Sequence, residues 1–161
     1  MAPQTSVQQS QVSHSIVIDA DPASVFDVLV DPTQHPLFDG SGTVKGSISG
    51  PPRLYLGATF SMRMHWYAPY AIRNTVIEYE EDRRIGWRHF ARHVWRYELE
   101  PIDGERGVAT KVTETFDYAR APLSRLYGPL GFVGNAQSAI PATLQQLKTL
   151  VESRTVIRTE K

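Results

Sequence analysis

The chain has 161 residues, the size of one ordinary domain, and is long enough to bury an apolar core without disulfides or metal ions. It has no cysteine, which excludes disulfide scaffolds, thiolate nucleophiles and cysteine-based zinc or iron–sulfur sites. Its 17 Lys and Arg residues balance 17 Asp and Glu residues, and this neutrality argues against nonspecific nucleic-acid binding.

Both ends of the chain are polar. Residues 1–11 lack the apolar stretch of a signal peptide, and no later apolar run approaches the roughly 20 residues of a membrane span. We therefore expect a cytoplasmic protein with a disordered tail at 1–11, a single ligand-binding domain at 12–153 and a flexible tail at 154–161.

The first predicted elements are a strand and two short helices. Residues 12–19 alternate polar and apolar side chains, which predicts a strand half-buried against a core. Asp21 is placed to cap a helix, Pro22 suits its first position, and an apolar stripe at helical spacing follows. The pair Asp31-Pro32 repeats the signal and predicts a second short helix over 33–38.

From residue 43 onward the apolar period changes to two and turn residues recur. This pattern predicts five or six further strands, and their short connections favour antiparallel pairing. The strands cover residues 43–49, 59–67, 71–80, 84–90, 94–102 and 107–118. In the clearest of them, Phe60, Met62, Met64 and Trp66 share one face.

Helical spacing returns near the C-terminus. Apolar side chains recur there every three or four residues and predict a long helix with one core-facing stripe, formed by Ile140, Leu144, Leu147 and Val151. Pro141 lies inside this pattern, so we expect a kink or a helix start near it. The preceding segment 128–134 is apolar but contains three glycines, which is compatible with a movable lid.

The order of elements resembles the helix-grip fold of the START and pathogenesis-related-allergen superfamily, called SRPBCC. Residues 15–29 (SIVIDADPASVFDVL) are similar to its first strand and helix, and residues 31–36 (DPTQHP) to its second helix. Residues 95–101 (WRYELEP), followed by 112–117 (VTETFD), resemble the paired late strands of its polyketide cyclase/dehydrase-like branch.

This resemblance covers about residues 12 to 153 and implies an α+β helix-grip fold. In that fold a curved antiparallel sheet of about seven strands wraps around a long C-terminal helix, and two short helices follow strand 1. Members of the superfamily bind lipids, sterols, polyketides or quinones. Some catalyse cyclisation or dehydration, and many are only carriers.

Strand alternation constrains which residues face the concave side of the sheet. Trp87 and Tyr97 are both expected to point inward, so their two strands must pair odd with odd residues. Centring this hairpin on Arg92 sets Trp87 opposite Tyr97, and His89 opposite Trp95.

The last hairpin is expected to turn through a four-residue loop at 103–106. Such a loop sets Tyr97 beside Val112, and Trp95 beside Glu114. The concave face is then expected to carry one polar row across three strands, formed by His89, Trp95 and Glu114, next to an apolar row formed by Trp87, Tyr97 and Val112.

Glu114 is the main candidate catalytic residue, and His89 is its candidate partner. A carboxyl group on an apolar face needs a partner or stays protonated, at a cost of several kcal/mol. One interpretation is a structural Glu114 bonded to a neighbouring Arg, Tyr or Trp. The other is a general acid or base, or a contact to a ligand hydroxyl.

The candidate ligand-binding residues are mostly aromatic or methionine side chains of the inner face, which either fill a core or line a pocket. They are Met62, Met64, Trp66, Asn74, Trp87, Trp95, Tyr97, Val112 and Phe132. His89 and His93 flank a hairpin tip without further ligands at suitable spacing, so we expect no metal site.

Three functions remain open from the sequence. The first is binding or transport of a small hydrophobic or aromatic molecule, such as a lipid or polyketide, in an internal cavity. The second is a cyclase or dehydratase that uses a cavity carboxylate without a cofactor. The third is a protein-interaction or stress-response module with a closed cavity. We expect no cofactor, no nucleic-acid partner and no stable membrane insertion, and a monomer or homodimer.

Overall fold

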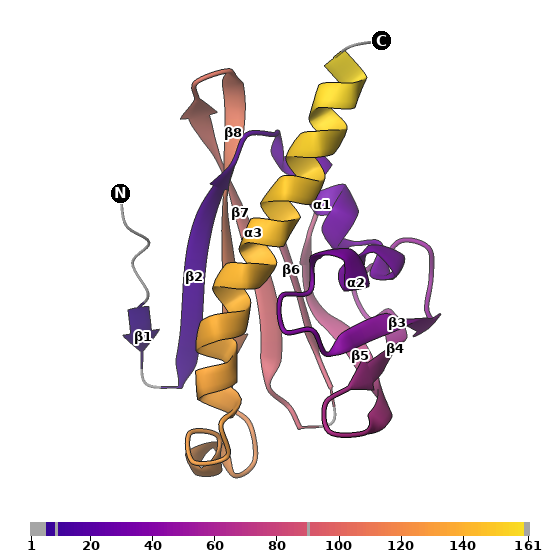
Figure 1. The fold of residues 1–161 in the computed structure, drawn as a ribbon, viewed down its shortest axis with the longest axis vertical. Coiled ribbons are helices and arrows are strands. Elements are labelled where there is room, and N and C mark those ends of the chain that lie inside the picture. Colours follow the sequence, from indigo (N-terminus) through magenta and orange to yellow (C-terminus); the bar gives the residue numbers. More distant parts are fainter. Residues whose placement is uncertain (1–5, 9, 90, 160–161) are drawn as a thin grey trace.

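The computed structural model describes residues 6–8, 10–89 and 91–159. One antiparallel sheet curves around a long C-terminal helix, and short helices cover one end of its concave side (Figure 1). The strands are β1 (Ser6–Gln8), β2 (Gln11–Ile18), β3 (Val44–Ser49), β4 (Thr59–His65), β5 (Pro69–Glu80), β6 (Arg84–Arg88), β7 (Val94–Gly104) and β8 (Gly107–Asp117). The helices are α1 (Pro22–Leu29), η1 (Pro32–Gln34), α2 (His35–Phe38), η2 (Ser124–Leu126) and α3 (Phe132–Thr159).

The predicted helix-grip architecture is confirmed. The strands are ordered β1-β2-β8-β7-β6-β5-β4-β3, and every pairing is antiparallel. The described sheet has eight strands because β1 pairs with the start of β2. This short strand lies in the segment assigned to a disordered tail, and α3 extends to Thr159, into the segment assigned to a flexible tail.

The helix after β2 begins as its sequence predicts. Asp21 caps α1, and its Oδ1 accepts a hydrogen bond from the Ser24 backbone N–H at 2.9 Å. Pro22 occupies the first position, where its missing N–H costs nothing. The second predicted helix is split into η1 and α2, and Asp31 caps η1 through Thr33.

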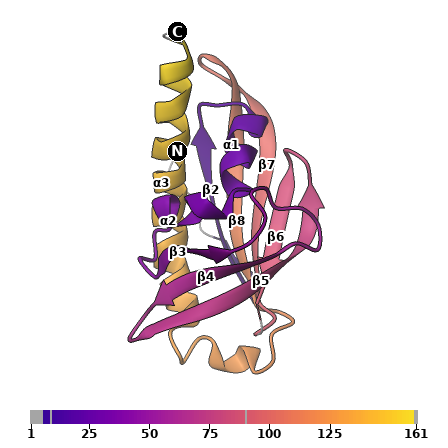
Figure 2. The ribbon, with the colours of Figure 1, turned by 90° about the vertical axis from the view of Figure 1, so that its right-hand side faces the viewer.

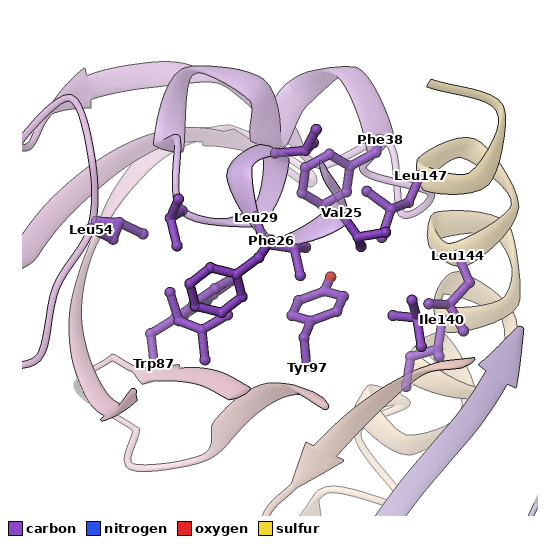
Figure 3. Close-up of a cluster of buried hydrophobic side chains, with 14 of the residues drawn as sticks. Val25, Phe26, Leu29, Phe38, Leu54, Trp87, Tyr97, Ile140, Leu144 and Leu147 are labelled. Atoms are coloured by element: carbon purple, nitrogen blue, oxygen red, sulfur yellow. The ribbon is translucent and has the colours of Figure 1, made fainter. Parts of the chain in front are cut away.

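The core lies where α1, α2 and α3 meet the sheet (Figure 3). All four residues of the predicted stripe on α3 are buried: Ile140, Leu144, Leu147 and Val151. The helix begins at Phe132, so Pro141 lies inside it and does not mark its start. Gly40, which follows α2, approaches α3 backbone to backbone, because a Cβ built on it would lie 2.3 Å from the Thr143 nitrogen.

The outer face of the sheet carries paired charges. Arg96 on β7 donates two hydrogen bonds to Glu78 on β5, at 2.6 and 2.7 Å, and Arg84 pairs with Glu98 at 2.7 Å. These contacts cross strands whose inner faces are apolar. The sheet therefore separates an ion-paired outer surface from an apolar concave side.

The strand register differs from the predicted one by two residues in both late hairpins. Trp87 pairs with Trp95 in β6–β7, and Tyr97 pairs with Glu114 in β7–β8. As predicted, odd residues of β6 pair with odd residues of β7, and odd residues of β7 pair with even residues of β8. Each side chain therefore faces the expected side of the sheet. The rows across the sheet are different, and Glu114 lies beside Tyr97 instead of Trp95.

Turn geometry explains the shift. The last hairpin turns through two residues, and Gly104 faces Gly107 across the turn. Gly107 has φ +123°, a conformation that side chains rarely adopt, and a Cβ on Gly104 would lie 2.7 Å from the Ala109 Cβ. These two glycines allow a tighter turn than the predicted four-residue loop. In the other hairpin the ladder ends at Arg88 opposite Val94, so the connection is longer than expected.

Candidate ligand-binding site

A cavity of about 560 Å³ lies between the concave face of the sheet, the α2 region and the first turns of α3. Its volume falls within the roughly 300–1,000 Å³ typical of small-molecule sites. Its wall is mainly aromatic and aliphatic. Strands β4, β6, β7 and β8 and the turn after β4 contribute rings, which are Phe60, Trp66, Trp87, Trp95, Tyr97 and Phe116. The strand β5 adds Ile72 and Asn74, and α3 adds Phe132, Ala139 and Thr143.

Glu114 is the buried acid of this cavity. Its side chain comes from β8, is 3% exposed and accepts a hydrogen bond from the Tyr97 hydroxyl at Oε1, at 2.8 Å. Its other oxygen, Oε2, is buried and has no hydrogen-bond partner among the described residues. Burial is the main cause that raises the pKa of Glu114 to about 8, so the group is largely protonated at neutral pH.

Two neighbouring side chains shift the pKa of Glu114 in opposite directions. The Tyr97 hydrogen bond stabilises the ionised form, and the negative charge of Asp39 disfavours it. Asp39 follows α2 and is itself held by the Ser41 hydroxyl at 2.7 Å and the Val44 backbone N–H at 2.9 Å. Burial, together with the nearby acid, also raises the pKa of Tyr97 well above its usual value, so its hydroxyl stays a donor.

A second buried polar group, His35 of α2, forms part of the wall. Burial lowers its pKa to about 4, so the ring is neutral at neutral pH. Its Nε2 lies 2.9 Å from the Leu29 carbonyl, which can only accept, so Nε2 carries the proton. The ring stacks on Trp87 with centroids 5.0 Å apart. His35 is therefore a satisfied polar group that positions an indole of the cavity wall.

Two further histidines lie near the opening of the cavity. The His89 and His93 rings meet edge to face with centroids 3.9 Å apart, and His93 Nδ1 lies 3.0 Å from the Tyr127 hydroxyl. Burial lowers the pKa of His89 to about 4 and that of His93 to about 3, so both rings are neutral at neutral pH. Among the described residues no group of three His, Asp or Glu side chains gathers as a metal site requires.

Most of the predicted site residues lie on this wall. They are Glu114, His89, Met62, Met64, Trp66, Asn74, Trp87, Trp95, Tyr97 and Phe132. Val112 does not belong to the wall: it is fully buried in the apolar core, where it pairs with Leu99 and not with Tyr97 as the predicted register had it. The two-residue register shift also removes the predicted row of His89, Trp95 and Glu114, and leaves His89 beyond the end of β6.

Several wall residues have no counterpart in the sequence prediction. His35 and Asp39 belong to α2 and its exit, and Thr143 and Ala139 belong to α3. The segment between β8 and α3 contributes Tyr127, whose ring stacks on Tyr118 with centroids 5.6 Å apart. Periodicity identifies which face of a single helix or strand is buried. These residues line the cavity because separate elements pack together there, which periodicity does not predict.

Residues 9–152 match the family described as polyketide cyclase/dehydrase and lipid transport. The chain belongs to this family. The resemblance to the polyketide cyclase/dehydrase-like branch of SRPBCC is thereby confirmed, and this family member has a fold of the ligand-binding SRPBCC type.

One relative of this polyketide cyclase/dehydrase family member is the uncharacterized protein Rv0088 of Mycobacterium tuberculosis. It is 36% identical over 142 residues, which make up 85% of this chain and 62% of the relative. A second sequence from that species, the uncharacterized protein MT0096, is 35% identical over the same length. The chain therefore spans less than two thirds of the length of these relatives.

Solved structures share the fold at low identity. Protein Ms6760 of Mycobacterium smegmatis superposes with a TM-score of 0.69 at 15% identity, over 96% of this chain and 98% of that protein. The di-domain ARO/CYC protein StfQ from the steffimycin biosynthetic pathway gives a TM-score of 0.61 at 12% identity, over 91% of this chain and 51% of StfQ. At these identities the likeness shows the fold alone. No helix in the described part of this family member is long and apolar enough to cross a bilayer.

Proposed function

We propose that the protein binds a small, largely apolar molecule in its cavity and contacts one oxygen atom of that molecule through Glu114. The observation that carries this proposal is the unpaired Glu114 Oε2 in a cavity of about 560 Å³ whose wall is mainly apolar. A buried polar atom without a partner costs about 1–3 kcal/mol, and a ligand that pairs with it recovers that cost.

The protonation state of Glu114 defines the ligand chemistry. Oε1 accepts the Tyr97 hydroxyl, so the proton of the neutral carboxyl group resides on Oε2. An O–H donor inside an apolar cavity favours a ligand with a carbonyl or hydroxyl oxygen over a carboxylate, which the negative charge of Asp39 also disfavours. The indoles of Trp87 and Trp95 add flat surfaces suited to an aromatic ring system.

A pair of fluorescent probes tests the role of the oxygen. Prodan is a neutral naphthyl ketone, and N-phenylnaphthylamine is a neutral aromatic of similar size without an oxygen. We expect both to bind, and the affinity for prodan to fall about tenfold as the pH rises from 7 to 9, because Glu114 loses its proton. The affinity for N-phenylnaphthylamine is expected to change by much less. Equal pH profiles for the two probes would contradict the Glu114 contact.

A substitution that fills the cavity tests the location. Ala139 lies on the wall, so Ala139→Phe is expected to weaken both probes at least tenfold. The matched control is Ser138→Phe on the same helix, because Ser138 is exposed and lies off the wall. If Ala139→Phe and Ser138→Phe bind the probes equally well, the cavity is not the binding site.

A second candidate function is dehydration of a β-hydroxy ketone, which the raised pKa of Glu114 supports, since both its acid and base forms exist near neutral pH. Glu114 Oε2 gives its proton to the departing hydroxyl as the carbon–oxygen bond breaks, and water leaves. The resulting carboxylate takes the proton from the neighbouring carbon as the double bond forms, which returns Glu114 to its starting state. The family description, polyketide cyclase/dehydrase, is in keeping with this chemistry.

An aromatic β-hydroxy ketone is a suitable test substrate, because its dehydration gives a conjugated enone with strong ultraviolet absorbance. We expect Glu114→Gln to abolish enone formation while prodan affinity at pH 7 stays within about threefold, since the glutamine amide still donates one hydrogen bond. Enone formation at an unchanged rate in Glu114→Gln would exclude Glu114 as the acid. Probe binding without any enone formation would support the binding function alone.

A further inference from the structure

We propose that the open end of the cavity docks on an anionic lipid bilayer. Three connections surround this end: residues 66–70, which join β4 to β5 and include the first two residues of β5, residues 91–93 between β6 and β7, and residues 119–131 between β8 and α3. We call these three connections the mouth rim. Figure 2 shows the first and third of them at the lower end of the molecule, on either side of the start of α3. This surface is distinct from the ligand contact at Glu114.

The exposed part of the cavity wall lies at this end within the described part of the chain. Most of the cavity wall is buried or half-buried, and its exposed members all come from the mouth rim or the first turn of α3. They are Trp66, Tyr70, Pro122, Leu123, Leu126, Leu130 and Asn135. The two sides of the opening touch, since the Trp66 and Phe132 rings lie 5.6 Å apart.

The mouth rim is unusually apolar for a surface. Tyr67 is 92% exposed and stacks on Trp66, which is 40% exposed, with ring centroids 5.6 Å apart. Across the opening, Leu123 is 74% exposed and Leu130 is 61% exposed. Large apolar side chains grouped at one exposed end mark an interaction site.

Charge distinguishes this end from the rest of a neutral protein. The sequence has no Asp or Glu in residues 40–77, 88–97 or 118–151. The mouth rim carries three exposed arginines, Arg92, Arg120 and Arg125, and none of them has a carboxylate within ion-pair distance among the described residues. The acids gather elsewhere, for example in the turns after β5 and β7.

This combination fits a membrane surface. Trp and Tyr side chains favour the boundary between acyl chains and headgroups, leucines can insert below it, and arginines can contact anionic phosphates above it. The exposed apolar side chains of the mouth rim come from two segments far apart in the chain, residues 66–70 and 119–131, which together flank the opening. The bilayer is therefore the partner whose chemistry matches all three features.

Vesicle flotation with the full chain tests the proposal. We expect binding to vesicles of phosphatidylcholine with phosphatidylglycerol, and affinity on the order of a hundredfold lower for phosphatidylcholine alone, since each of three arginines contributes about fivefold. Arg120→Gln with Arg125→Gln is expected to lose about 25-fold on the anionic vesicles. The matched control is Arg83→Gln with Arg106→Gln, two exposed arginines in turns away from the mouth rim, which is expected to bind as the wild type does.

Two matched double variants test how much the apolar side chains contribute to vesicle binding. Tyr67→Ser with Leu123→Ser is expected to lose about a hundredfold or more. Tyr55→Ser with Leu56→Ser removes exposed side chains of the same types from the loop before β4, at the opposite end of that strand from Trp66, and is expected to bind normally. All four changes are at exposed positions, and thermal melting checks that each variant is folded.

Trp66 reports insertion directly. Lipids brominated near the headgroup end of the chain are expected to quench the wild type but not Trp66→Phe, because Trp87 and Trp95 remain inside the fold. The docking proposal is overturned if the wild type does not bind anionic vesicles, or if the Tyr67 and Leu123 variant binds as tightly as its control. Ala139→Phe is expected to keep vesicle binding, so failure of docking and failure of cavity binding are separate results.

Discussion

Replacing Glu114 by glutamine removes a buried carboxyl group whose pKa is raised from 4.5 to about 8. Above pH 4.5 the unfolded chain releases this proton, whereas the folded protein keeps it until about pH 8. The free energy of unfolding of the wild type therefore falls by about 1.4 kcal/mol per pH unit through this window because of Glu114, and the loss is complete above pH 8. The glutamine in Glu114→Gln does not titrate, so the free energy of unfolding of this variant does not fall for that reason.

The magnitude follows from the two pKa values. Between pH 6 and pH 9, the stability of Glu114→Gln relative to the wild type is expected to increase by about 3 kcal/mol. Burial also lowers the pKa values of His35, His89 and His93, and their contribution has the opposite sign: it is lost as the pH falls below 6.5. The histidines are present in both proteins, so the difference between wild type and variant isolates Glu114.

Urea unfolding at constant ionic strength measures these differences. Glu78→Gln is the matched control, because Arg96 holds the pKa of Glu78 below its usual value. That variant is expected to be destabilised equally at pH 6 and pH 9. If the wild-type and Glu114→Gln stabilities run parallel over this range to within about 0.5 kcal/mol, Glu114 is ionised in the folded protein and the reasoning from burial is wrong.

Two further predictions concern packing and hydrogen bonding. Tyr97→Phe leaves Glu114 without its hydrogen-bond donor, so we expect the pKa of Glu114 to rise further and the free energy of unfolding to fall by about 1–2 kcal/mol. Carboxyl carbon NMR measures the pKa, and an unchanged or lower value would contradict the contact. Gly40→Ala puts a methyl group 2.3 Å from the Thr143 nitrogen and is expected to lower the free energy of unfolding by at least about 2 kcal/mol, measured by thermal or urea unfolding. Gly46→Ala, with open space around it, is expected to lower it by well under about 1 kcal/mol. Equal effects would contradict the close approach of Gly40 to α3.

Local sequence signals account for most of the architecture. The Asp21 cap and Pro22 fix the start of α1, and the spacing from Ile140 to Val151 predicts the buried side of α3. Alternation in β4 also identifies Met62 and Met64 as inward residues. These features depend on residues a few positions apart, so one segment of sequence contains the information.

The partners across the site could not be predicted in the same way. Parity identifies the inward face of β7 and β8, but the residue opposite Glu114 depends on the turn that joins the strands. The position of His35 depends on how α2 packs against Trp87, and Tyr127 reaches the cavity from an irregular segment. Such contacts join segments far apart in the chain, where periodicity carries no information.

The glycine pair at the tip of the β7–β8 hairpin has a consequence for how related chains can diverge. If the turn were formed by residues 103–106 instead of 105–106, one strand would slide along the other and Trp95, not Tyr97, would lie opposite Glu114. The indole and the phenol differ in acidity and reach, so replacing these glycines and widening the turn, far from the cavity, would change the proton affinity of Glu114 inside it. Turn length in this hairpin is therefore a remote determinant of cavity chemistry, even where every wall residue stays the same.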